Sequence, residues 1–243
     1  MSIIRKNLPN ALTCCNLICG CIATGFAFSG SFGWALAFIV GGAVFDFFDG
    51  FVARLLGVSS PVGVELDSLA DDITFGFAPA TIVYALLRDA QWPLADSTVG
   101  TLLPYLAFLM AAFSALRLAK FNLDTRQTTS FIGLPTPANA LFWGALAVGW
   151  GDALMAWAYS PYVLLPGVLL SCYLMVSEIP MFALKFKSFR WADNRLRYSF
   201  LLVSLALLLV MGAAGFSAAI VLYVVLSVLA ARRPQAGANS SQR

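Results

Sequence analysis

The amino-acid sequence predicts a polytopic all-α membrane protein, and three features support this class: its composition, its long apolar runs and the placement of its basic residues. Of the 243 residues, 60% are hydrophobic and 11% are charged, whereas a typical soluble domain has about 45–50% apolar and about 25% charged residues. The 15 basic and 12 acidic side chains are too few to solvate a water-soluble globule of this size. Because the sequence contains no histidine, any chemistry depends on carboxylates, hydroxyls or thiols.

Eight apolar runs are candidates for helices that cross a bilayer, and the last two of them are short. A spanning helix needs about 20 residues, and backbone groups in hydrocarbon must be hydrogen-bonded within their own segment. The polar stretches between the runs are too short for a soluble domain, so we expect one transmembrane domain over residues 1–233 and a disordered cytoplasmic tail over residues 234–243. The expected spans cover residues 11–29, 33–55, 68–87, 101–120, 138–156, 161–178, 198–213 and 217–231.

The basic residues concentrate in alternate loops. If the N-terminus lies in the cytoplasm, fourteen of the fifteen Lys and Arg residues fall on the cytoplasmic side and Arg88 alone falls outside. This asymmetry follows the rule that cytoplasmic loops carry an excess of positive charge. It predicts an even number of spans with both termini in the cytoplasm. We expect membrane lipids as partners and no nucleic acid.

Half of the acidic residues fall in one short segment, since six of the twelve lie between positions 46 and 72. Asp46 and Asp49 are three residues apart in the second apolar run, and Asp67 and Asp71 are four apart at the start of the third. Each pair therefore shares one face of its helix. An unpaired carboxylate at membrane depth costs at least a few kcal/mol, and neighbouring carboxylates repel each other. Their coexistence indicates bound cations.

Oxygen ligands without histidine favour a hard divalent ion, Mg²⁺ or Mn²⁺, over zinc. Four carboxylates can hold two ions, which together stabilise the attacking and leaving oxygens in a phosphoryl transfer. Gly50 and Ala53 leave the next helix turn open to a bulky group, and Arg54 offers a bidentate partner for phosphate. Helix caps or ion pairs without metal are one alternative. A cation or proton transporter is another, because membrane carboxylates also act as relays.

The same residues form a motif that resembles the signature of the CDP-alcohol phosphatidyltransferases. The match holds at all eight positions, which are Asp46, Asp49, Gly50, Ala53, Arg54, Gly63, Asp67 and Asp71. Four further stretches resemble the phosphatidylserine synthase branch of this family, at residues 8–20, 63–80, 115–122 and 131–140.

The resemblance implies that the phosphatidyl group of CDP-diacylglycerol is transferred to the hydroxyl of L-serine, with release of CMP. It implies two metal ions on Asp46, Asp49 and Asp67, with Asp71 as partial ligand and general base. It also implies a homodimer in a bacterial-type cytoplasmic membrane, with the active site facing the cytoplasm. The expected CDP-binding residues are Gly50, Ala53, Arg54, Gly63, Asn10 and Thr13. For the last two, helix capping or interhelical bonding is an equal alternative.

Arg117, Lys120 and Asn122, at the cytoplasmic end of the fourth run, are candidates for binding the serine carboxylate or the lipid phosphate. Arg117 lies within the apolar run, where a charge needs a partner, although anchoring by basic residues alone accounts for two of the three. The same chemistry with another acceptor, such as glycerol 3-phosphate or an inositol phosphate, stays open. A dianionic acceptor would require at least two further cationic side chains beside the site.

Overall fold

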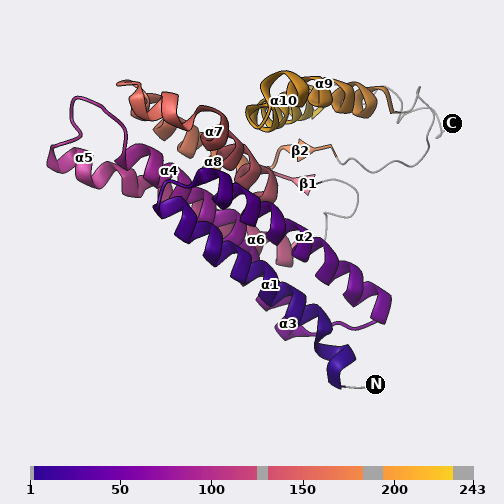
Figure 1. Ribbon diagram of the computed structural model, residues 1–243. Coiled ribbons are helices and arrows are strands. Elements are labelled where there is room, and N and C mark those ends of the chain that lie inside the picture. Colours follow the sequence, from indigo (N-terminus) through magenta and orange to yellow (C-terminus); the bar gives the residue numbers. More distant parts are fainter. Residues whose placement is uncertain (1–2, 125–130, 183–193, 232–243) are drawn as a thin grey trace.

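The computed structural model describes residues 3–124, 131–182 and 194–231, which are almost entirely helical (Figure 1). The described residues contain one short antiparallel ladder, between β1 (Phe131–Ile132) and β2 (Pro180–Met181). The all-α class expected from the sequence is confirmed. The helices are α1 (Ile3–Phe28), α2 (Phe32–Leu56), α3 (Pro61–Asp71), the π-helical turn η1 (Asp72–Phe77), α4 (Ala78–Arg88), α5 (Thr98–Leu102), the 3₁₀ helix η2 (Leu103–Phe108), α6 (Leu109–Leu123), α7 (Thr136–Ala156), α8 (Pro161–Val176), α9 (Arg195–Met211) and α10 (Ala214–Ala231).

Within the described residues, five helical segments are long and apolar enough to cross a membrane, and two further apolar helices are shorter. The protein is therefore an integral membrane protein of the polytopic helical class. All eight expected runs are helical, although the first begins at Ile3 and the third at Pro61, earlier than expected. The span count, the side of each terminus and the single domain stay predictions, and the expected tail at 234–243 lies outside the described residues. The five long segments are 7–28, 32–56, 61–88, 98–123 and 214–231.

A tight turn after α2 returns the chain antiparallel to that helix and so brings α3 beside it. Gly57 ends α2 with a positive φ of 62°, a conformation that glycine adopts without steric cost. Ser60 then caps α3, because its hydroxyl accepts a hydrogen bond from the Gly63 backbone N–H at 3.0 Å. Pro61 occupies the first turn, where its missing N–H costs nothing. The turn places the carboxylates of α3 opposite those of α2.

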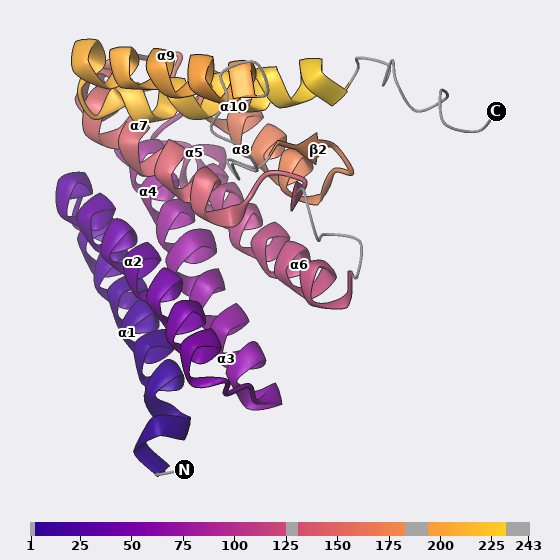
Figure 2. The same cartoon turned by 90° about the vertical axis from the view of Figure 1, so that its right-hand side faces the viewer.

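The continuous rod formed by α3, η1 and α4 runs through the centre of the bundle. Every residue of α4 except Tyr84 and Arg88 is buried, as expected for a helix covered on all sides. The hairpin of α1 and α2 packs on one flank of the rod, and α6 and α7 pack on others. In both views α9 and α10 lie side by side and cross the direction of α1 and α2 at a large angle (Figures 1 and 2).

Two glycines allow α1 and α2 to approach η1 closely, and both face Thr74. Added Cβ atoms at Gly20 and at Gly42 would collide with Thr74. The buried Thr74 hydroxyl donates a hydrogen bond to the carbonyl of Asn16 at 3.0 Å. Small residues commonly permit such close helix contacts in membranes. This junction fixes Asn16, whose side chain reaches the carboxylate cluster.

Gly42→Ala should lower both stability and activity. Its new methyl group would lie 2.5 Å from Thr74 Cγ2 and 2.8 Å from Asn16 Oδ1, and such overpacking costs about 1–3 kcal/mol. Thermal unfolding in detergent measures the first effect and CMP release the second. Gly33→Ala, on the same helix with open space around its Cβ, is the matched control. Adding Thr74→Ser should restore part of the loss, and no rescue would locate the strain elsewhere.

Candidate functional site

Three carboxylates from two helices form the centre of the site. Asp46 and Asp49 on α2 and Asp67 on α3 each offer an oxygen, and these oxygens lie within 4.8 Å of one another. Oxygens that bind one ion at about 2.0–2.6 Å can be no more than about 5 Å apart. Within the part of the chain that the structure describes, buried Asp67 Oδ1 also has no hydrogen-bond partner, which is unfavourable for a carboxylate unless a cation occupies the site. The donor set fits a hard divalent ion.

Asp71 stands apart from these three carboxylates. It lies one helical turn beyond Asp67, at the end of α3, and is not part of the group within 4.8 Å. Its Oδ1 accepts a hydrogen bond from Asn16 Nδ2 at 3.0 Å. Asn16 is fully buried, and its own Oδ1 has no hydrogen-bond partner. The structure therefore places Asp71 beside the three carboxylates, oriented by an amide of α1.

Thr13 connects α1 to the same cluster. Its hydroxyl lies 2.6 Å from Asp49 Oδ2 and 3.1 Å from the carbonyl of Pro9. The hydrogen bond to Asp49 is the interhelical bond that the sequence left open as an alternative to nucleotide binding. Thr13 is 3% exposed, and it still borders the cavity described next.

A cavity of about 480 Å³ opens between α1, α2 and α3, and Asp49 and Asp67 lie in its wall. Arg54 is not one of the residues that line this cavity; it is exposed, and its guanidinium Nη1 lies 3.4 Å from the position of a Cβ on Gly50, which does line it. Asn7, Ser59 and Ser60 also line it and were not predicted from the sequence. For Ser60, the helix-capping pattern was the available signal. Five of the six expected CDP-binding residues line the cavity, namely Asn10, Thr13, Gly50, Ala53 and Gly63.

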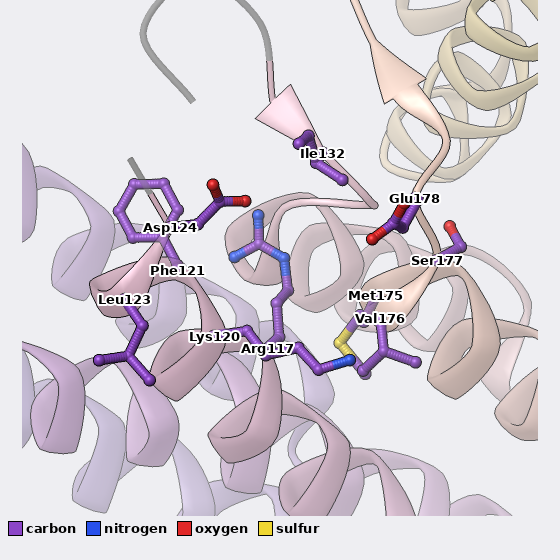
Figure 3. A pocket seen from close by; sticks show the side chains of 10 residues that line it. All are labelled: Arg117, Lys120, Phe121, Leu123, Asp124, Ile132, Met175, Val176, Ser177 and Glu178. Carbon is purple, nitrogen blue, oxygen red and sulfur yellow. The ribbon is translucent and has the colours of Figure 1, made fainter. Parts of the chain in front are cut away.

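A second cavity, of about 400 Å³, lies between the end of α6, β1 and the end of α8 (Figure 3). Arg117 and Lys120 line it. Arg117 is only 8% exposed, and its buried Nε has no hydrogen-bond partner among the described residues. The helix that carries Arg117, α6, packs against α3 and η1, which meet at Asp71, so the cavity and the carboxylates lie on neighbouring helices. Asn122 is not part of the lining, because its amide donates to Ser68 Oγ on α3 at 2.8 Å.

Two acidic residues of this cavity were not found by sequence reasoning. Asp124 ends α6, and Glu178 follows α8. Both lie near basic residues in space but far from the aspartate motif in sequence, so no spacing pattern indicated them. Figure 3 shows the Arg117 side chain standing between the two carboxylates.

Comparison with known proteins agrees with the motif. The CDP-alcohol phosphatidyltransferase family model matches residues 6–231. The chain is 35% identical over 176 residues to the CDP-diacylglycerol--serine O-phosphatidyltransferase of Bacillus subtilis, covering 71% of this chain and 88% of the relative. It is 34% identical over 188 residues to the protein of the same name from Mycobacterium tuberculosis (72% of this chain, 60% of the relative). A Helicobacter pylori protein of that name is 36% identical over 135 residues (55% and 54%). The family expected from the eight motif positions is confirmed, and this chain belongs to the CDP-alcohol phosphatidyltransferases.

Proposed function

We propose that this protein is a phosphatidylserine synthase, which transfers the phosphatidyl group of CDP-diacylglycerol to the hydroxyl of L-serine and releases CMP. The observation that carries the proposal is the pair of cavities that adjoin one carboxylate cluster. One cavity is lined by five residues of the motif, namely Asp49, Gly50, Ala53, Gly63 and Asp67. The other contains Arg117 on α6, which packs against α3 and η1 where they meet at Asp71. A nucleotide in the first and a small acceptor in the second would meet at the carboxylates.

The chain's own groups account for binding and proton transfer. Asn10, Gly50 and Gly63 border the space for the CDP moiety, and Arg54 at its rim can pair with phosphate. Asp71 takes the proton from the serine hydroxyl as the serine oxygen attacks the phosphorus that carries the diacylglycerol. The bond from that phosphorus to the CMP oxygen breaks, and CMP leaves. Asn16 holds Asp71 in place for this proton transfer.

A divalent cation, Mg²⁺ or Mn²⁺, fits the group of Asp46, Asp49 and Asp67. When bound, it would neutralise the pyrophosphate charge and stabilise the developing charge on the leaving oxygen. We propose two ions, with Asp71 contributing to the second. Exposed Glu65, which lies two residues before Asp67, is not part of the group.

The decisive experiment measures CMP release from CDP-diacylglycerol by the purified protein in detergent, with Mg²⁺ or Mn²⁺ and no ion gradient. The acceptor panel contains L-serine, glycerol 3-phosphate and an inositol phosphate. We expect metal-dependent release that L-serine alone stimulates. Stimulation by a phosphorylated acceptor in place of serine would change the assigned substrate. The absence of CMP would contradict the transferase proposal and favour the transporter alternative.

We further propose a homodimer in a bacterial-type cytoplasmic membrane, with the active site facing the cytoplasm. The orientation is supported by the fourteen basic residues on one side of the expected topology. Crosslinking in native membranes tests the dimer. Labelling of cysteines introduced at exposed Trp34, near the start of α2, and at exposed Val62, near the start of α3 after the turn that ends α2, tests the orientation.

Arg117→Lys should weaken the binding of L-serine much more than the binding of CDP-diacylglycerol. A guanidinium pairs with a carboxylate through two parallel hydrogen bonds, which an ammonium cannot reproduce. Loss of a charge-assisted hydrogen bond costs about 1.5–3 kcal/mol, so the serine KM should rise about tenfold to a hundredfold. Steady-state kinetics with each substrate varied in turn measure both KM values. An unchanged serine KM with a raised lipid KM would assign Arg117 to the lipid phosphate instead.

A further inference from the structure

The cavity around Arg117 carries charges of both signs. Arg117 and Lys120 supply cations from α6, while Asp124 and Glu178 supply carboxylates from two different segments. In Figure 3 the carboxylate of Glu178 points into the cavity from the side opposite Asp124. A site for an anion alone gains nothing from carboxylates in its wall, because like charges raise the cost of binding.

A free amino acid is the small ligand that matches this pattern, since its carboxylate and its ammonium group are separated by a single carbon. From this geometry we propose that Glu178 binds the α-ammonium group of the acceptor while Arg117 binds its carboxylate. The inference rests on the proposed function, and the feature by which the cavity recognises the acceptor is its α-ammonium group. With both charged ends held, the hydroxyl is free to turn toward Asp71, which lies where α3 and η1 meet against the helix of Arg117.

The segment that carries Glu178 is held firmly in place. The backbone N–H of Gly133 donates to the carbonyl of Ile179 at 2.9 Å, and Leu134 N–H donates to the carbonyl of Leu174 at 2.9 Å. Gly133 has a positive φ of 73°, and an added Cβ would lie 2.6 Å from the Met175 carbonyl. Only glycine fits there without strain. These bonds bracket Glu178 and fix it at the wall of the cavity.

Glu178 suits the ammonium group better than Asp124 does. Asp124 ends the same helix that carries Arg117 and is half-buried, whereas Glu178 is exposed to an acceptor arriving from water and comes from a separate segment. Two anchors on separate segments fix the orientation of a short ligand as well as its position. Both carboxylates also disfavour dianionic acceptors such as glycerol 3-phosphate.

The test compares L-serine with glycerate, in which a hydroxyl replaces the ammonium group, using CMP release in detergent. In Glu178→Gln the serine KM should rise about tenfold to a hundredfold. The inhibition constant of glycerate should not rise, because loss of a carboxylate removes repulsion of an anion that has no ammonium group. The KM of CDP-diacylglycerol, which uses no ammonium contact, should change less than about threefold. Glu178→Asp, which keeps the charge, should recover part of the serine affinity. Asp152→Asn, a carboxylate in a cavity at the other end of α7, is the control and should behave as wild type.

The outcomes separate this inference from the function on which it rests. If wild-type protein shows no serine-stimulated CMP release, the proposed function fails. If wild type uses serine but Glu178→Gln keeps the wild-type ratio between the glycerate inhibition constant and the serine KM, the role of Glu178 is wrong and the function stands. If Asp124→Asn shows the loss and Glu178→Gln does not, the ammonium site belongs to Asp124.

Discussion

Asp71→Asn should lower turnover by about 10²- to 10⁴-fold, the range that a general base contributes, while CDP-diacylglycerol and at least one metal ion still bind. An amide has nearly the shape of a carboxylate but cannot take the proton of the serine hydroxyl. Asp71 lies outside the three carboxylates whose oxygens are within 4.8 Å of one another, so the group proposed to hold the first ion stays complete. CMP release measures turnover, and binding of labelled CDP-diacylglycerol and of Mn²⁺ measures the rest.

Asp72→Asn is the matched control for this variant. Asp72 follows Asp71 directly, but its Oδ1 lies near Gly76 and Ser114, on the side toward α6. We expect turnover within a fewfold of wild type. Near-normal turnover of Asp71→Asn would show that another group accepts the proton, and loss of metal binding in Asp71→Asn would make Asp71 a principal ligand.

The fold was predictable from the sequence because hydrocarbon leaves the backbone few choices. Long apolar runs had to be helices, and all eight are. The starts of α1 and of α3 were missed because a search for apolar runs stops at polar residues such as Asn10 and Glu65. A helix forms its backbone hydrogen bonds whatever its side chains are, so it can begin among polar residues. The π-helical turn η1 was not predictable either, since it depends on Thr74 packing between Gly20 and Gly42 of two other helices.

The parts of the site that lie on a single helix were predictable from the sequence. Spacing alone showed that Asp46 and Asp49 share a face, and that Asp67 and Asp71 do. Spacing within a helix says nothing about distances between helices, so the separation of Asp71 from the other three needed the structure. The carboxylates of the second cavity were missed for the same reason.

Asp46→Ala or Asp67→Ala should abolish binding of the metal ion and of CDP-diacylglycerol together. Each variant removes one of three carboxylates from a compact group. A hard cation depends on charged oxygen ligands, so two remaining carboxylates hold it much more weakly. Without the cation, those carboxylates repel the pyrophosphate of the nucleotide. Mn²⁺ titration followed by electron paramagnetic resonance measures the ion, and binding of labelled CDP-diacylglycerol measures the lipid. Wild-type protein treated with EDTA should lose lipid binding to the same extent.

Glu65→Gln controls for the loss of a negative charge in this region, because Glu65 is exposed and outside the group of three. It should bind Mn²⁺ and lipid as wild type does. Lipid binding that survives in Asp46→Ala after metal binding is lost would contradict the coupling. The nucleotide would then be held by the cavity of α1, α2 and α3 and by Arg54 alone, and the cation would act only on the leaving oxygen. Because EDTA removes the ion without changing the chain, agreement between EDTA and Asp46→Ala separates loss of the ion from damage to the fold.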